Sequence, residues 1–260
     1  MTRLAVDRPA AGVLRLRLDG AETLNALDDG VKGELLLQLA YAAEDMSARV
    51  LLLTGTGRAF CAGGDVGAMG ERSALETMSV LSKARRITEQ IVALQKPVVA
   101  AVNGLASGAG FNLALASDII LASKDSWFQQ SFVRMGLVPD MGGTYFLARQ
   151  VGLYRAKELL LSGRRITSAE ARELGFVAHV FDDEFDARSV EYCAKLACGA
   201  TQALGATKFL TNRAVEGSLQ DALDKETLAQ GVVSTTDDHK AAVRAFKQKK
   251  DLSSVQFKGE

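Results

Sequence analysis

The first half of the chain alternates short apolar runs with stretches of helical periodicity. Residues 13–18 (VLRLRL) alternate apolar and charged side chains, as a half-buried strand does. Residues 24–39 carry apolar side chains at helical spacing. The all-apolar run at residues 50–53 predicts a buried strand, and the glycine-rich stretch of residues 54–70 predicts a long loop.

The same alternation then repeats along the chain. Residues 75–94 predict a helix and residues 98–102 a second buried strand. A glycine-rich turn, residues 104–110, leads into an apolar helix at residues 111–116, and residues 119–121 predict a third strand. Strands and helices in this order indicate an α/β fold.

Helices dominate from about residue 144 onward, where residues 177–181 are the one strand-like run. The helical segments are residues 148–161, 168–174, 186–197, 204–215, 219–232 and 238–249. The sequence therefore predicts an α/β core, residues 1–200, followed by a helical C-terminal region, residues 201–260.

Composition and charge exclude several classes of protein. The 31 basic and 31 acidic residues cancel, which leaves no electrostatic footprint for nucleic acid or an anionic membrane. No apolar stretch is long enough to span a membrane, and residues 1–9 contain no apolar signal core. Cys61, Cys193 and Cys198 are odd in number and lack metal-type spacing. We expect a cytoplasmic protein without disulfides, a zinc site, or a nucleic-acid or membrane partner.

Two glycine-rich loops each follow a predicted buried strand. The first is residues 60–65 (FCAGGD), and the second, residues 103–110 (NGLASGAG), opens a helix. Glycine permits close approach of a ligand to the main chain, and the start of a helix presents unpaired N–H groups. Two such loops side by side would form an oxyanion hole by aiming two N–H groups at one oxygen. Packing alone also produces glycine-rich turns, so the loops by themselves leave both interpretations open.

The glycine spacing argues against a dinucleotide site. Gly104, Gly108 and Gly110 do not form the G-x-G-x-x-G pattern, no acidic residue ends the next strand at the required place, and no P-loop lysine follows. An NAD-dependent dehydrogenase is therefore the least favoured alternative, and failure to bind NAD would remove it.

Three longer motifs carry a family resemblance. Residues 59–66 (AFCAGGDV), 96–110 (KPVVAAVNGLASGAG) and 136–144 (GLVPDMGGT) resemble the signatures of the enoyl-CoA hydratase/isomerase (crotonase) superfamily, in the same order. Residues 25–27, 168–177 and 245–249 fit as well, so the resemblance spans nearly the whole chain. It implies a crotonase (ClpP-like) spiral of ββα units with a helical C-terminal trimerisation region. It also implies acyl-CoA thioester substrates and a homotrimer or a hexamer built as a dimer of trimers.

The resemblance also assigns residues around the thioester. By position, Gly64 and Ala109 would supply the two N–H groups for the thioester oxygen. Ala109 stands where many relatives have glycine, but a main-chain donor needs no particular side chain. Ala62, Asp65 and Val66 would lie along the pantetheine and adenine of CoA, with Asp65 expected to hydrogen-bond its own loop.

Further CoA contacts are implied near the two ends of the chain. Phe246 and Lys249 match positions that meet the CoA adenine and phosphate, although a lysine-rich helix end is also typical of a solvated surface. Leu24 belongs to the implied CoA-binding set, but relatives often carry a basic residue there, and residues 21–24 supply no basic group for that phosphate contact. CoA enters as part of the substrate, and no metal or redox cofactor is implied.

The carboxylates distinguish between the reactions of the family. Its hydratases use two glutamates, and the matching positions here are Asn112 and Phe132, neither of which can act as a general base. One carboxylate remains, Asp140, and a single base suffices to move a proton between two carbons. Residues 138–143 (VPDMGG) resemble the ring-1,2-epoxyphenylacetyl-CoA isomerase branch. The sequence therefore favours an enoyl-CoA isomerase, Δ3–Δ2 or ring-type, with Asp140 as the base.

Alternatives remain for Asp140 and for the chain. Asp140 precedes a predicted helix start near Gly142, so its carboxylate could cap that helix, which lowers a pKa, whereas burial would raise it. Asn112 suits a hydrogen bond to the substrate or to Asp140. The chain could instead be an enoyl-CoA hydratase (a lyase) of fatty-acid β-oxidation or a non-catalytic acyl-CoA-binding relative. Fatty-acid and phenylacetate breakdown both stay open as pathways.

Several other side chains have a simpler interpretation as structural groups. Aromatic residues near the motifs favour the core or the wall of an acyl pocket; they are Phe111, Trp127, Phe128 and Phe132. His179 and His239 match no catalytic position and are expected to be structural. Three apolar residues suit either a flexible pocket side or the core; they are Met69, Met78 and Leu81.

Overall fold

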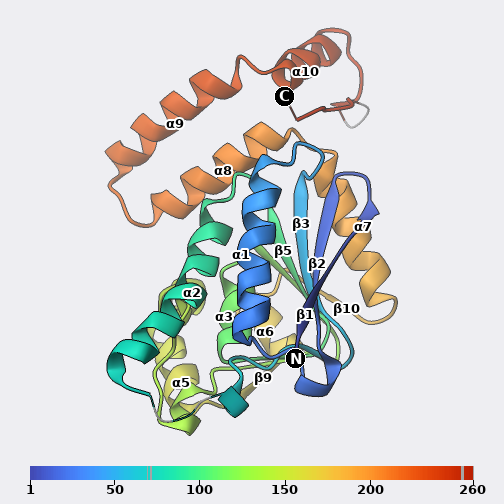
Figure 1. The fold of residues 1–260 in the computed structure, drawn as a ribbon. Helices are drawn as coiled ribbons and strands as arrows, with labels where there is room; N and C mark the ends of the chain where they lie inside the picture. The colour runs from blue at the N-terminus through green and yellow to red at the C-terminus, as the bar shows by residue number, and fades with distance from the viewer. Residues whose placement is uncertain (69, 71, 253–254, 260) are drawn as a thin grey trace.

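Two sheets run through the molecule, one large and one small, with helices packed around them (Figure 1). The computed structural model describes residues 1–68, 70, 72–252 and 255–259. The strands are β1 (Arg3–Ala10), β2 (Val13–Asp19), β3 (Val50–Gly55), β4 (Ala59–Cys61), β5 (Val98–Val102), β6 (Leu105–Ser107), β7 (Ile119–Ser123), β8 (Trp127–Gln129), β9 (Arg165–Thr167) and β10 (His179–Phe181). The α-helices are α1 (Asp29–Glu44), α2 (Ala74–Ala93), α3 (Ala109–Leu115), α4 (Gly143–Val151), α5 (Leu153–Ser162), α6 (Ser168–Glu173), α7 (Phe185–Ala197), α8 (Thr201–Ala214), α9 (Leu219–Val233) and α10 (Asp237–Lys247).

Successive ββα units build both sheets. The large sheet has the strand order β1-β2-β3-β5-β7-β10, and the small sheet has the order β4-β6-β8-β9. Each of the pairs β3/β4, β5/β6 and β7/β8 contributes one strand to each sheet and is followed by a helix. From β2 to β10 the large sheet is parallel, so its strands all end at one edge, where the small sheet and its loops begin. The predicted α/β spiral of ββα units is confirmed.

The all-apolar strands are explained by burial on both faces of the large sheet. Alternate side chains such as Leu51 and Leu53 pack into the larger core with α1, α2 and α3. Their neighbours Val50 and Leu52 pack into a second core with α7. A parallel strand covered on both faces carries a continuous apolar run rather than an alternating pattern, which is what residues 50–53 show.

Two predicted helices differ from those in the structure. The helix expected at residues 24–39 begins at Asp29, because Asp28 caps it by accepting a hydrogen bond from the Val31 N–H at 3.0 Å. Residues before the cap cannot be helical, since Leu24 and Asn25 have φ of 53° and 58°. The helix expected at residues 148–161 is two helices, α4 and α5, separated by Gly152.

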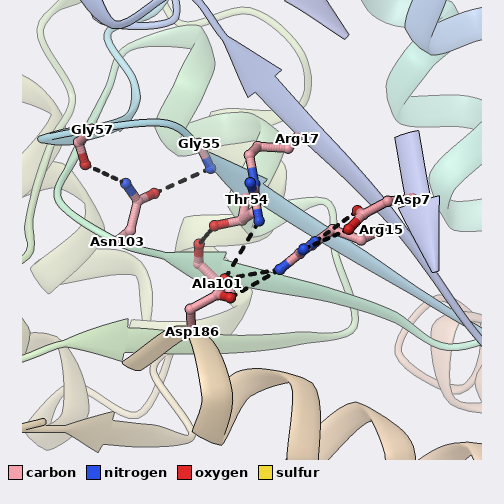
Figure 2. Close-up of polar contacts among 9 residues, drawn as sticks. All are labelled: Asp7, Arg15, Arg17, Thr54, Gly55, Gly57, Ala101, Asn103 and Asp186. Atoms are coloured by element: carbon pink, nitrogen blue, oxygen red, sulfur yellow. Dashed lines mark hydrogen bonds and ion pairs between the residues drawn. The ribbon is translucent and has the colours of Figure 1, made fainter. Parts of the chain in front are cut away.

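A buried arginine joins three elements of the fold (Figure 2). The guanidinium of Arg15, on β2, pairs with Asp7 of β1 at 2.6 Å and with Asp186 of α7 at 3.0 Å. Its side chain is buried, so its charge requires these partners. The pairs link α7 and the edge strand β1 to β2.

The last three helices extend beyond the sheets (Figure 1). Lys208 anchors α8, because its ammonium group pairs with Asp118 at 2.9 Å and donates to the Ile91 carbonyl oxygen at 2.7 Å. The described part of α9 has no buried residue. Within the described ranges, no helix has the length and apolar character to cross a membrane, and no group of side chains has the makeup of a metal site.

Candidate active site

The first glycine loop rests on residues 24–27. The Leu27 N–H donates to the Gly63 carbonyl oxygen at 2.8 Å, and the Ala62 N–H donates to the Leu24 carbonyl oxygen at 2.9 Å. Asn25 is fully buried, and its amide donates to the Ala59 carbonyl oxygen at 2.7 Å. The left-handed main chain at Leu24 and Asn25, together with these hydrogen bonds, therefore holds the first loop in place.

Asn103 joins the second loop to the first (Figure 2). Its side-chain oxygen accepts from the Gly55 N–H at 3.1 Å, and its amide nitrogen donates to the Gly57 carbonyl oxygen at 2.8 Å. Gly55 ends β3 and Gly57 lies between β3 and β4, where the first ββα unit turns from one sheet to the other. The side chain thus fixes the relative position of the two loops, a role that the motif alone did not reveal.

Main-chain atoms of the two loops are in direct contact. A Cβ at Gly63 would lie 2.9 Å from the Ser107 carbonyl oxygen and 3.4 Å from the Ala109 nitrogen, and Gly63 has a φ of +106°. A Cβ at Gly110 would lie only 2.2 Å from the Cys61 carbonyl oxygen. Glycine is required at both positions because any side chain would push the loops apart.

Two unpaired N–H groups result from this contact. Among the described residues, the N–H groups of Gly64 and Ala109 donate to no main-chain acceptor. Ala109 is the first residue of α3, where an N–H has no acceptor within the helix. One oxygen placed between the loops would find two main-chain donors, which is the arrangement an oxyanion hole requires.

Asp140 does not cap α4, which corrects the helix-cap alternative. The N-cap of α4 is Gly142, and no side chain caps it. Asp140 is half-buried, and its Oδ1 is shielded from solvent and has no hydrogen-bond partner in the described part of the chain. Burial raises the pKa of this carboxyl, while its own N–H, the Lys32 ammonium and the Asn112 amide partly offset the rise. A raised pKa suits a general base more than a structural carboxylate.

Asn112 lies on α3, one turn after Ala109, and is fully buried. Its amide nitrogen donates to the main-chain carbonyl oxygen of Asp140 at 2.9 Å. Of the two partners that the sequence left open, the structure therefore shows Asp140, through its main chain. Its side-chain oxygen accepts from Gln130, a residue that the sequence gave no reason to select.

The aromatic residues divide between the core and the site. Phe111 and Phe128 are fully buried, with ring centroids 5.1 Å apart. Phe132 belongs to the larger core and also lies beside the second loop, where a Cβ at Gly108 would be 3.8 Å from its ring. Trp127 packs under the Arg165 guanidinium, 4.0 Å from its ring centroid.

Two residues of α2 that the sequence assigned to either a flexible pocket side or the core are not in the core, so the core interpretation is wrong for them. Met78 and Leu81 are exposed. Met69 lies outside the described residues. His179 stacks on Phe181, in keeping with a structural role.

The predicted CoA-contacting residues lie in two separate regions. Ala62 and Asp65 are half-buried in the first loop, Val66 is exposed, and Asp65 accepts from the Gly67 N–H at 3.0 Å as expected. Phe246 and Lys249 are exposed at the end of α10, in the upper part of Figure 1, whereas the start of α2 lies at the bottom. Within one chain the structure does not bring these two regions together.

Comparisons with known proteins assign nearly the whole chain to one family. The family model described as enoyl-CoA hydratase/isomerase matches residues 8–259. The chain belongs to the enoyl-CoA hydratase/isomerase family. That family acts on acyl-CoA thioesters.

Individual members of the enoyl-CoA hydratase/isomerase family include both isomerases and hydratases. The chain is 37% identical to 1,2-epoxyphenylacetyl-CoA isomerase of Escherichia coli K12 and 33% identical to 2,3-dehydroadipyl-CoA hydratase of the same organism, with both chains fully covered in each case. Among solved structures, enoyl-CoA hydratase from Bacillus anthracis superimposes with a TM-score of 0.94 at 31% identity, covering 99% of this chain and all of that one. Family membership alone therefore leaves the reaction undecided.

Proposed function

We propose that the chain is an enoyl-CoA double-bond isomerase, of the Δ3–Δ2 or the ring type, with Asp140 as its single base. The observation that carries the proposal is the solvent-shielded, unpartnered Oδ1 of Asp140 next to α3, the helix that begins with Ala109. Asn112 and Phe132, at the positions of the hydratase glutamates, offer an amide and a hydrocarbon ring. Neither accepts a proton.

The proposed mechanism moves one proton. For a 3-enoyl thioester, Asp140 takes a proton from C2, and the electron pair spreads over the thioester oxygen and C4. The N–H groups of Gly64 and Ala109 stabilise the negative oxygen, each contributing about 3 kcal/mol in the transition state. The Asp140 carboxyl then returns the proton to C4, which leaves the double bond between C2 and C3 and restores the base.

Two substrates separate this reaction from hydration. Purified protein is given trans-3-hexenoyl-CoA and crotonyl-CoA side by side, with absorbance and product mass as readouts. We expect the first substrate to be isomerised and the second to be barely hydrated, because hydration needs a further group to activate water. Appreciable hydration of crotonyl-CoA would favour the hydratase alternative, in line with the 2,3-dehydroadipyl-CoA hydratase relative. Tight binding without turnover of either ester would indicate a non-catalytic acyl-CoA-binding protein.

Replacing Lys32 should move the acid limb of the isomerase pH profile. Asp140 must be ionised to act, so kcat/KM falls as the pH drops through its pKa, which burial raises. The buried Lys32 ammonium opposes that rise, so Lys32→Met should shift the acid limb to higher pH. The control is Lys83→Met, because Lys83 also faces Asp29, at 3.9 Å, but is exposed and is not among the charges acting on Asp140. Equal profiles for the two variants would contradict the assignment of the limb to Asp140.

We propose further that the chain assembles as a homotrimer, or as a hexamer of two trimers, through its C-terminal helices. The described part of α9 has no buried residue, yet it exposes large apolar side chains on two opposite sides of the helix; these are Leu219 and Leu223 on one side, and Leu228 and Val232 on the other. Between α8 and α9 runs a groove with apolar lining that includes Ala203, Leu210 and Val233. Apolar patches of this kind mark subunit contacts. In such an assembly Phe246 and Lys249 would meet the CoA adenine and phosphate of a bound substrate.

Charging α9 should dissociate the assembly. Leu228 is 73% exposed in the single chain, so Leu228→Glu leaves the fold intact but places a carboxylate in the proposed contact. Sedimentation velocity should show the native protein as a trimer or hexamer and the variant as a monomer. The control is Tyr154→Glu on α5, because the Tyr154 side chain is also exposed in the single chain but lies outside the proposed contact. A monomeric native protein, or dissociation by the control alone, would contradict the proposal.

A further inference from the structure

A buried pair of amides stands behind Asp140. Gln130 directly follows β8 and is 1% exposed, and Asn112 on α3 is 0% exposed. The Gln130 Nε2 donates to the Asn112 Oδ1 at 2.8 Å, and the Asn112 Nδ2 donates to the Asp140 main-chain oxygen at 2.9 Å. The three groups form a chain of hydrogen bonds that ends on the residue carrying the proposed base.

The direction of this chain depends on Gln130. An asparagine amide has one accepting end and one donating end, so the donor that occupies its oxygen decides where its nitrogen points. With the Gln130 N–H on its oxygen, Asn112 turns its nitrogen to Asp140. If the amide were reversed, its oxygen would face the Asp140 carbonyl oxygen, two acceptors without a proton between them.

The Asn112 amide lies tightly against the turn that carries Asp140. A Cβ at Gly143 would lie 2.4 Å from the Asn112 Oδ1, so the start of α4 is in contact with the amide. The Gly143 N–H also donates to the Asp140 carbonyl oxygen at 2.9 Å. Between the two, Met141 and Gly142 have φ of 46° and 81°. The Asp140 carbonyl oxygen thus accepts from two donors, the Gly143 N–H and the Asn112 amide, and these bonds stabilise the turn. Gln130 orients the second donor.

We propose that Gln130 is a positioning residue for the isomerase reaction: it orients the Asn112 amide and so fixes the place of the Asp140 carboxyl in the site. The inference rests on the proposed role of Asp140. The Gln130 Oε1 is buried without a hydrogen-bond partner among the described residues. The bond from Nε2 to Asn112 is therefore the one hydrogen bond that the Gln130 side chain makes with them. A base displaced by a fraction of an ångström loses rate while the binding of the CoA ester is unaffected.

A carboxyl in place of the amide gives a sharp test. The Gln130→Glu side chain donates to Asn112 while it is protonated and can only accept once it is ionised. With trans-3-hexenoyl-CoA, the ratio of variant to native kcat at the same pH should stay near one at low pH. It should fall about tenfold, reversibly and with little change in KM, as the pH rises through the pKa of the introduced carboxyl. Gln130→Met, which never donates, should show the lowered kcat at every pH.

The matched control is the same substitution one residue earlier. Gln129 is also buried, but its amide donates to the Gly163 carbonyl oxygen, at 2.6 Å, and not to Asn112. Gln129→Glu should therefore change thermal stability without adding a titration to kcat. If both glutamate variants gain the same pH dependence, or if Gln130→Met keeps the native kcat, Gln130 has no positioning role.

A second readout is independent of turnover. In protein labelled with 13C-aspartate, the Asp140 carboxyl signal is identified by its loss in Asp140→Asn and followed from low to high pH. Gln130→Met should alter its shift and titration, and Gln129→Glu should not. An altered signal in a protein that does not isomerise 3-enoyl-CoA would support the positioning role and reject the isomerase. An unaltered signal in an active isomerase would reject the positioning role alone.

Discussion

The Asp140→Asn protein should isomerise trans-3-hexenoyl-CoA at least about a hundredfold more slowly than the native protein, a typical contribution of a general base. The amide keeps the size of the carboxyl but cannot accept the proton from C2. Asn112 donates to the main-chain carbonyl oxygen of Asp140 at 2.9 Å, and the substitution leaves that contact in place. The loss should therefore appear in kcat, measured by initial rates, and the dissociation constant of the CoA ester should be unchanged.

Stability against pH separates a base from a helix cap in the same variant. Because burial raises the folded-state pKa of Asp140, ionising this carboxyl costs the native protein stability as the pH rises through that value. Asp140→Asn should thus be as stable as the native protein at low pH and more stable near neutrality. A capping carboxylate would show the opposite, with stability lost near neutral pH. Asp183→Asn is the control for kcat, since Asp183 is exposed, pairs with Lys124 and lies outside the candidate site.

The sequence was sufficient for the strands and helices that bury many side chains. Strand 98–102 was predicted with its observed bounds, because five consecutive apolar residues between two covered faces leave no alternative. Five strands were missed: β1, which has no buried residue, and four strands of three residues each, β4, β6, β8 and β9. A segment of three residues is too short to show a period, and these short strands exist because neighbouring ββα units place them side by side.

The start of α1 shows why local patterns place an element more reliably than its ends. Apolar spacing from residue 24 suggested a helix, yet Leu24 and Asn25 are left-handed because the first glycine loop bonds to this segment. The contacts that override helical spacing come from Gly63 and Ala59, far along the chain. Tertiary hydrogen bonds of this kind leave no trace in local periodicity.

For the candidate site, motifs located the residues but not their partners. The sequence placed Asp140 near the site and left its cap role open, and only the structure shows Gly142 at the cap position. Gln130 and Lys32 carried no motif and no period. Gln130 is one polar residue directly after β8, and Lys32 resembles any lysine on an amphipathic helix. Their relevance arises from burial beside Asp140, which is a property of the folded chain.

Gly110→Ala should separate the two loops and lower kcat/KM for the 3-enoyl thioester by about a hundredfold. The added Cβ would lie 2.2 Å from the Cys61 carbonyl oxygen, which is main chain and cannot turn aside. Relief of this contact moves the start of α3 away from β4, so the Ala109 N–H no longer meets the same oxygen as the Gly64 N–H. Loss of one such donor costs a factor of about 100 to 1,000. Overpacking should also lower the free energy of unfolding by about 1–3 kcal/mol.

The stability cost needs its own control, because a weakened fold could lower activity by itself. Gly205 on α8 offers one, since a Cβ there would lie 2.3 Å from the Gln95 carbonyl oxygen, a main-chain contact outside the glycine loops. Gly205→Ala should lose comparable stability in urea unfolding yet keep the native kcat/KM at temperatures where it stays folded. Equal losses of activity in the two variants would mean that weakened packing, and not the spacing of two N–H groups, limits the rate. A Gly110→Ala protein with native kcat/KM would show that the reaction does not need both donors on one oxygen, and the proposed hole at Gly64 and Ala109 would fall with it.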